Sequence, residues 1–179
     1  MSEVAFDAEI ADTAAGRLAR TIHRGTPILL VILGLMLYLG ARFHVAINDQ
    51  SAKCLPPYKV FLVDRHDRTI DRGGIYAFFA GERMAPFFAP EMLVIKQVVG
   101  GPGDRVQVTE ATTKVNAETV GAGLDLAKTL GKPEEQLVRE LEVPQDALWI
   151  MGATRDSFDS RYWGPLPMHQ IIGRAYALF

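Results

Sequence analysis

The feature that most constrains the fold is an apolar run near the start of the chain. Residues 27–41 carry no charged side chain, and the apolar character resumes after Arg42 and continues to Ile47. A helix needs about 20 residues to cross the hydrocarbon core of a bilayer. Residues 27–47 reach that length if the Arg42 side chain extends its charge to the interface. We therefore predict a membrane anchor over residues 26–47, with a buried core helix or a cleaved signal peptide as the alternatives.

The charges on either side of this run predict its orientation. Positively charged residues are more numerous before the run than after it. They are Arg17, Arg20 and Arg24 before it, and Arg42 and Lys53 after it. Such residues favour the cytoplasmic side of a membrane. We therefore expect residues 1–25 to lie in the cytoplasm and residues 48–179 to form a domain outside it.

The pattern after the anchor is typical of a mainly β domain. Short runs of strand-forming residues alternate with turn signals, at residues 58–63, 74–79, 92–99, 105–109, 147–151 and 171–178. One stretch differs, because residues 133–141 begin with a proline and two acids and place Leu137 and Leu141 on one helical face. We therefore expect a helical insertion at about residues 122–142.

The composition excludes several classes of function. The formal net charge is −2, so no basic surface indicates binding of nucleic acid. Cys54 is the single cysteine, which rules out an internal disulfide and a cysteine-based zinc site. We expect no metal, no cofactor and no nucleic-acid partner.

Lys96 is notable because it interrupts an apolar strand. The period of a strand places Val94, Lys96 and Val98 on one face. A lysine between valines loses hydration, which disfavours its charged form. A neutral amine can act as a general base. The same pattern also fits an edge-strand lysine whose amine reaches water.

The residues after Lys96 form a specific motif. Residues 96–104 read Lys-Gln-Val-Val-Gly-Gly-Pro-Gly-Asp. Their glycines, Gly103 among them, predict a turn with positive φ angles, which Asp104 can close through its side chain. The motif resembles the Lys-Arg-x-x-Gly-x-Pro-Gly-Asp box of type I signal peptidases. This resemblance implies that Lys96 is the general base of a serine/lysine-type dyad.

Two further stretches resemble strand boxes of this family, in the family's order. Residues 71–78 resemble its Arg-Gly-Asp box, with Gly74 in place of the usual acid. Residues 143–152 resemble the Val-Pro strand that ends in Met-Gly. The resemblance covers residues 48–179 and implies a mainly β, signal-peptidase/LexA-like catalytic fold after a single transmembrane helix.

A polar stretch at residues 152–164 resembles the family's last box. The matching residues are Ser157, Asp159, Ser160 and Arg161. The resemblance implies that they brace the catalytic lysine rather than react, and Asp159 and Arg161 can pair. Ala153 and Thr154 depart from the family, which has Asp-Asn there. Without the resemblance, the stretch would be interpreted as a solvated polar loop.

The family places its nucleophile just after the anchor, as Ser-hydrophobic-Pro in the conjugative TraF-like branch. Residues 54–56 read Cys-Leu-Pro, which has this spacing with sulfur in place of oxygen. A thiol is a good nucleophile once it is deprotonated. Cys54 is therefore our candidate nucleophile. The alternative is a purely structural role, in which Cys54 packs as a small buried hydrophobic residue. Ser51 is the alternative nucleophile, or a donor to the oxyanion hole.

The resemblance implies an endopeptidase in the bacterial inner membrane, with its catalytic domain in the periplasm. It would cleave exported precursors through an acyl-enzyme. The TraF-like spacing favours a conjugative pilin as the substrate, which the enzyme could also cyclise. The lipid bilayer and type IV secretion components are the other expected partners. The alternatives are a housekeeping leader peptidase and a catalytically inactive assembly factor of the conjugative transfer apparatus.

Several aromatic residues near these boxes are candidates for a surface that contacts lipid. They are Tyr58, Phe61, Phe78, Phe87 and Phe88. For Phe61 and Phe78, packing in a β core is an equally good interpretation.

Overall fold

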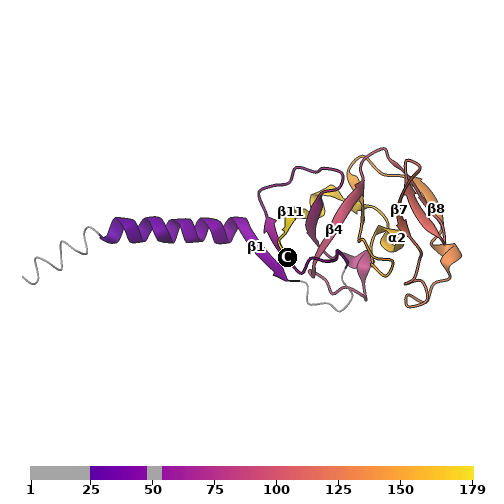
Figure 1. The fold of residues 1–179 in the computed structure, drawn as a ribbon, viewed down its shortest axis with the longest axis horizontal. Coiled ribbons are helices and arrows are strands. Elements are labelled where there is room, and N and C mark those ends of the chain that lie inside the picture. The colour runs from indigo at the N-terminus through magenta and orange to yellow at the C-terminus, as the bar shows by residue number, and fades with distance from the viewer. Residues whose placement is uncertain (1–24, 48–53) are drawn as a thin grey trace, which may run out of the picture. The chain divides into compact units, whose positions relative to one another are not determined.

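The computed structural model describes residues 25–47 and 54–179, which fall into two units that divide after Arg42 (Figure 1). The described part of the first unit is one helix, Gly25–Arg42. Its 18 residues are apolar enough to cross a membrane. Ser51 lies outside the described residues.

The helix ends earlier than the predicted anchor, which extends to residue 47. The next five residues form strand β1 (Phe43–Ile47), which pairs antiparallel with β2 (Val60–Asp64). The backbone groups of residues 43–47 are thus paired with another strand, which a continued helix would not allow. Aromatic and β-branched residues in this segment also favour a strand.

A large antiparallel sheet contains seven strands in the order β1-β2-β11-β3-β4-β9-β10. Beyond β1 and β2, its strands are β3 (Ile75–Phe79), β4 (Leu93–Gly100), β9 (Ala147–Met151), β10 (Leu166–Pro167) and β11 (Ile171–Ala177). Three short helices accompany it: η1 (Glu82–Met84), α2 (Ser160–Trp163) and η3 (Met168–Gln170). All six runs predicted as strands are confirmed, and five of them belong to this sheet.

A small antiparallel sheet contains four strands in the order β7-β6-β5-β8. They are β5 (Arg105–Val108), β6 (Thr112–Val115), β7 (Glu118–Ala122) and β8 (Arg139–Glu142). A two-residue turn with φ of 50° and 70° joins β6 to β7, as expected for a tight hairpin.

The predicted helical insertion is wrong. Within residues 133–141 the chain forms only a short 3-10 helix, η2 (Glu134–Gln136), and then enters β8. β8 pairs with β5, and this pairing places Leu141 opposite Val106. Leu137 is buried just before this strand and Leu141 is half-buried within it, so strand pairing outweighs the local preference for a helix.

The buried apolar side chains form two clusters. The larger one joins the two sheets and includes Trp149 of β9 and Val106 of β5. The smaller one lies on the other face of the large sheet and contains Phe61. Phe61 and Phe78 are 2% and 0% exposed, so the interpretation of these two as lipid-contacting residues is wrong. Phe87 remains 45% exposed.

Candidate active site

Lys96 is buried inside the domain, with only 1% of its surface exposed. Val94 and Val98 are buried on the same face of β4, as the strand period predicts. The Lys96 amine donates a hydrogen bond to Ser157 Oγ at 2.6 Å. The alternative of a lysine that reaches water is therefore wrong.

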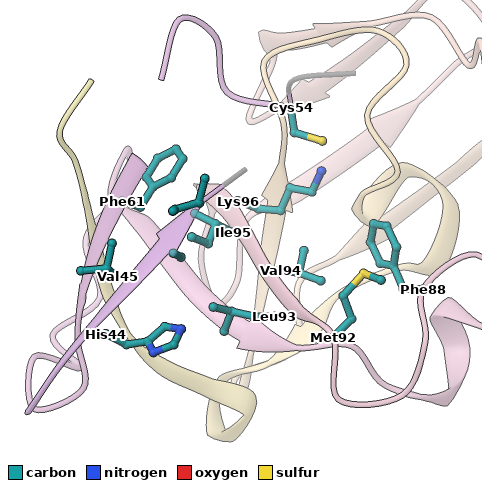
Figure 2. A pocket seen from close by; sticks show the side chains of 12 residues that line it. His44, Val45, Cys54, Phe61, Phe88, Met92, Leu93, Val94, Ile95 and Lys96 are labelled. Atoms are coloured by element: carbon teal, nitrogen blue, oxygen red, sulfur yellow. The ribbon is translucent and has the colours of Figure 1, made fainter. Parts of the chain in front are cut away.

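The amine lies beside a cavity of about 330 Å³ that Cys54 also lines. β9 pairs with β4 from Gln97 onward, so it leaves the Lys96 end of β4 uncovered on that side. Figure 2 shows the Cys54 sulfur and the Lys96 nitrogen directed toward the same region of the cavity. The structure thus brings together the two candidate reacting groups, which are 42 positions apart in the sequence (96 − 54).

The walls of this cavity are mainly apolar. They come from β1, from β2, from the start of β4 and from the segment between β3 and β4, with Ala46, Phe61, Phe88, Met92, Leu93 and Ile95 among the lining residues (Figure 2). Such a cavity suits an apolar peptide segment better than a charged one.

Ser157 holds the Lys96 amine from the side away from solvent. It is 1% exposed and is not among the residues that line the cavity. A hydroxyl that is buried in this way can orient an amine without meeting a substrate. The geometry fits the bracing role that the resemblance implies for Ser157.

Asp159 and Arg161 form a buried ion pair next to Ser157. Their side chains are 0% and 1% exposed, and Arg161 Nη2 lies 2.8 Å from Asp159 Oδ2. Asp159 also caps α2, because its Oδ1 accepts from the Arg161 backbone N–H. Burial lowers the pKa of Arg161, but the hydrogen bond and the charge of Asp159 outweigh burial and raise it.

The Arg161 guanidinium also donates hydrogen bonds to five backbone carbonyls. The acceptors are those of Ala122, Gly123, Thr154, Arg155 and Ser157, at 3.0 to 3.3 Å. One buried side chain therefore fixes the loop that presents Ser157. The interpretation of residues 152–164 as a solvated loop is wrong.

Two contacts tie this loop to β9 and to Gly152, the residue that directly follows it. Ser160 Oγ accepts from the Ile150 backbone N–H at 3.0 Å. Asp159 Oδ2 accepts from the Gly152 N–H at 3.0 Å. β9 is itself paired with β4, so the brace is fixed to the strand that carries Lys96.

Gly152 occupies the point where the Cys54 segment and the Ser157 loop meet. A Cβ at this position would lie 2.7 Å from Ser157 Cβ and 2.9 Å from the Cys54 carbonyl oxygen. The neighbouring Ala153 N–H donates to the same carbonyl at 2.7 Å. The sequence analysis placed Gly152 at the end of the Val-Pro strand motif but did not predict this packing role. The one feature that could have indicated it is a glycine directly after a buried strand.

Gly103 and Asp104 form the turn that follows β4, as predicted. Gly103 has a φ of +78°, and Asp104 Oδ2 accepts from the Gly101 N–H at 2.7 Å. Burial raises the pKa of Asp104, but the Gly101 and Asn116 hydrogen bonds and the Arg72 charge lower it overall. Neither Gly103 nor Asp104 is among the residues that line the cavity, so they can act only by fixing the end of β4.

Ala153 and Thr154, which replace the family's Asp-Asn, contribute backbone atoms to the site. The Thr154 carbonyl accepts from Arg161 Nη2 at 3.0 Å, whereas the buried Thr154 Oγ1 has no hydrogen-bond partner in the described part of the chain. Across residues 25–47 and 54–179, no group of three or more His, Cys, Asp or Glu side chains could hold a metal ion.

Comparison with known proteins gives a consistent result. A family model described as "Signal peptidase, peptidase S26" matches residues 18–179. A signal peptidase I from Leptolyngbya laminosa is 38% identical over 158 residues, which cover 82% of this chain and 75% of that protein. A conjugal transfer protein TraF from Agrobacterium fabrum is 27% identical over 128 residues, 67% of this chain and 66% of that protein. A probable signal peptidase I-2 from Synechocystis is 31% identical over 86 residues, 48% of this chain, and the match spans 37% of that protein's length.

Proposed function

Because the chain belongs to the signal peptidase family, peptidase S26, we propose that it is a membrane-anchored endopeptidase that cleaves exported precursor proteins with Cys54 and Lys96. One observation carries this proposal. A buried lysine that donates to Ser157 at 2.6 Å shares an apolar cavity with Cys54, the candidate nucleophile. A general base must lie within reach of the proton that it takes, and Lys96 and Cys54 line the same cavity.

The proposed reaction begins when the Lys96 amine takes the proton of the Cys54 thiol. The thiolate attacks the scissile carbonyl carbon, and the C–N bond then breaks as Lys96 returns the proton to the leaving amine. The acyl half of the precursor is now a thioester on Cys54. Lys96 takes a proton from a water molecule as the water oxygen attacks the thioester carbon, and it returns this proton to the departing Cys54 sulfur when the C–S bond breaks. The released carboxylic acid loses its own proton to solvent and leaves as the carboxylate.

Cleavage of a precursor by the full-length protein in detergent tests this function. We expect Lys96→Ala to lose activity, and Lys96→Arg to lose it too, because arginine cannot give up its proton. Lys132→Arg is the matched control, since Lys132 is exposed and is not among the cavity-lining residues. Near-normal cleavage by Lys96→Arg would refute the lysine-base mechanism, and a wild type with no activity on any precursor would favour an inactive assembly factor.

The same assay decides which residue is the nucleophile. Cys54→Ala should be inactive, and alkylation of the single cysteine should inactivate the wild type. An unchanged cleavage rate in Cys54→Ala, together with loss of cleavage in Ser51→Ala, would assign the nucleophile to Ser51.

A conjugative pilin is the substrate that we propose. The Cys-Leu-Pro spacing and the similarity to a conjugal transfer protein TraF support it. The higher identity to a signal peptidase I favours the second candidate, a housekeeping peptidase that cleaves many precursors. Competition between a pilin precursor and an unrelated exported precursor separates them, because a pilin peptidase should cleave only the first at a useful rate.

The thioester also allows a second outcome for a pilin. A thioester reacts with amines more readily, relative to water, than an oxygen ester does, and intramolecular positioning can supply a very large effective concentration. The N-terminal amine of the acyl segment can then form a new peptide bond and release the Cys54 thiol. Intact-mass analysis tests this, since a cyclic pilin is one water lighter than the linear chain, and a wholly linear product would reduce the function to hydrolysis.

A further inference from the structure

The turn that follows β7 packs against the loop that carries Ser157. The chain leaves β7 at Ala122 and turns at Gly123, whose φ is +71°. The carbonyls of both residues accept from Arg161 Nη1, at 3.0 and 3.1 Å. Leu124, which follows, is 1% exposed. The turn is therefore anchored in the core and takes part directly in holding the buried guanidinium.

A second contact joins the turn to α2. The Leu126 backbone N–H donates to Tyr162 Oη at 3.2 Å. Burial raises the pKa of Tyr162, and the hydrogen bond from Leu126 opposes this effect without reversing it. α2 lies beside β7 in the fold (Figure 1), and the bond between Arg161 and Ala122 joins the two elements.

An ion pair forms the third contact. Arg155 Nε and Nη2 donate to the Asp125 carboxylate at 3.1 to 3.3 Å, in a two-pronged geometry. Both side chains are well exposed, at 65% and 42%, so the pair adds little to the stability of the fold. The pair links the turn to Arg155, whose carbonyl accepts from Arg161 at 3.3 Å.

The loop that these three contacts hold reaches both candidate reacting groups. At one end, the Ala153 N–H donates to the Cys54 carbonyl at 2.7 Å. At the other end, Ser157 accepts from the Lys96 amine at 2.6 Å. Arg155 lies between these two ends in the sequence. A shift of the loop therefore changes the position of the nucleophile segment and the orientation of the amine together.

We propose that the turn at residues 122–126 is a positioning element of the active site, with Gly123 and Asp125 as its positioning residues. The proposal rests on the function proposed above for Cys54 and Lys96. It also gives a role to the departure from the family at Ala153 and Thr154. In the described structure these residues support the site through backbone atoms, and the carboxylate that steadies their loop comes from Asp125 across the fold.

Two glycines of this region provide a matched pair of variants. Gly123 and Gly131 both have a positive φ, +71° and +64°, so an alanine is strained at either position. At Gly123 the added Cβ would lie 2.6 Å from Asp125 Oδ1 and 2.8 Å from Arg155 Nη2, whereas at Gly131 it meets nothing within 4 Å. Both variants carry the backbone strain, but Gly123→Ala alone displaces the ion pair.

The kinetic test compares Gly123→Ala with Gly131→Ala in the full-length protein in detergent. Misplacement of a reacting group by about 1 Å can cost on the order of 100-fold in rate. We expect Gly123→Ala to lower kcat at least about tenfold with KM nearly unchanged, because the cavity walls are intact. Gly131→Ala should keep the wild-type kcat. Equal kcat values in the two variants, or a loss confined to KM, would overturn the proposal.

The ion pair is tested by a double-mutant cycle. Asp125→Ala and Arg155→Ala should each lower kcat, and the double variant should be no worse than either single variant. Glu140→Ala is the control, since Glu140 forms an exposed ion pair with Arg105 away from the site. Fully additive losses from Asp125→Ala and Arg155→Ala would show that the two side chains act separately and would refute the proposed role of the ion pair.

A measurement that does not require turnover keeps the test independent of the proposed function. Cys54 is the single cysteine, so the rate of alkylation by iodoacetamide reports on its surroundings. We expect Gly123→Ala to change this rate relative to wild type and Gly131→Ala to preserve it. If the wild type cleaves no precursor, the proposed function fails, and an alkylation rate unchanged in Gly123→Ala would then overturn the positioning role as well.

Discussion

Replacement of Arg161 by methionine should destabilise the domain strongly. The guanidinium and its partner Asp159 are almost fully buried, at 1% and 0% exposure, so Arg161→Met leaves a carboxylate in the interior without its counter-charge. Breaking a buried ion pair from one side costs about 3–5 kcal/mol in the free energy of unfolding. Five backbone carbonyls also lose a donor. Since domains of this size are stable by about 5–15 kcal/mol, the loss is a large fraction of the total.

Thermal and denaturant unfolding of the full-length protein in detergent measure this loss. For a chain of 150–250 residues, 1 kcal/mol corresponds to about 2–4 °C in Tm, so we expect a decrease of roughly 6–20 °C. Arg105→Met is the control, because the Arg105 side chain is 78% exposed in a loose pair and should cost about 1 kcal/mol or less.

The double variant Asp159→Leu, Arg161→Met separates the missing counter-charge from lost packing. It removes both charges, so we expect it to be more stable than Arg161→Met alone. Two results would refute the reasoning. One is a loss of less than about 1 kcal/mol in the free energy of unfolding for Arg161→Met, and the other is a loss in the double variant that equals the sum of the losses in the two single variants.

Three further predictions concern other parts of the protein. Although burial raises the pKa of Asp104, the Gly101, Asn116 and Arg72 contacts lower it overall, so its contribution to stability is present above about pH 4 and is lost as the pH falls further. In Asp104→Asn the free energy of unfolding, measured by denaturant titration at several pH values, should therefore fall less steeply below about pH 4 than in the wild type. An equally steep fall in both proteins would contradict this prediction. Gly152→Ala should abolish cleavage, because the new Cβ would press on Ser157 and on the Cys54 carbonyl; wild-type kcat would contradict this packing role. Protease added to spheroplasts should digest the chain after residue 48 and spare its N-terminus, whereas full protection of the C-terminal domain would overturn the proposed orientation.

The local features of the site could be predicted from the sequence because each depends on neighbouring residues. The period of β4 places Lys96 on the same face as Val94 and Val98, and the glycines after it predict the turn at Gly103. These two features follow from strand geometry and turn chemistry over a few residues. The brace at residues 157–161 was implied by the resemblance to the family, since the residues alone would be interpreted as a solvated polar loop.

The features that the sequence did not predict all depend on pairing across the fold. Residues 43–47 continue an apolar run, and only the pairing with β2 makes them a strand. Residues 139–142 follow a helix-like start, and only the pairing with β5 makes them β8. The contact between the turn at 122–126 and Arg161 joins residues 38 and 39 positions apart. Local propensity contains no information on such partners.

The buried charges next to Ser157 are better explained by positioning than by stability. Two ions in the interior lose their hydration, and apolar residues of similar volume would often stabilise a fold equally well or better. Asp159 and Arg161 instead make directional bonds to α2, to Gly152 directly after β9, and to the carbonyls of the Ser157 loop. A fully satisfied network of this kind restricts a loop to one arrangement. The 2.6 Å bond from Lys96 to Ser157 needs that restriction, because an amine that is free to rotate in an apolar cavity would seldom face the thiol of Cys54.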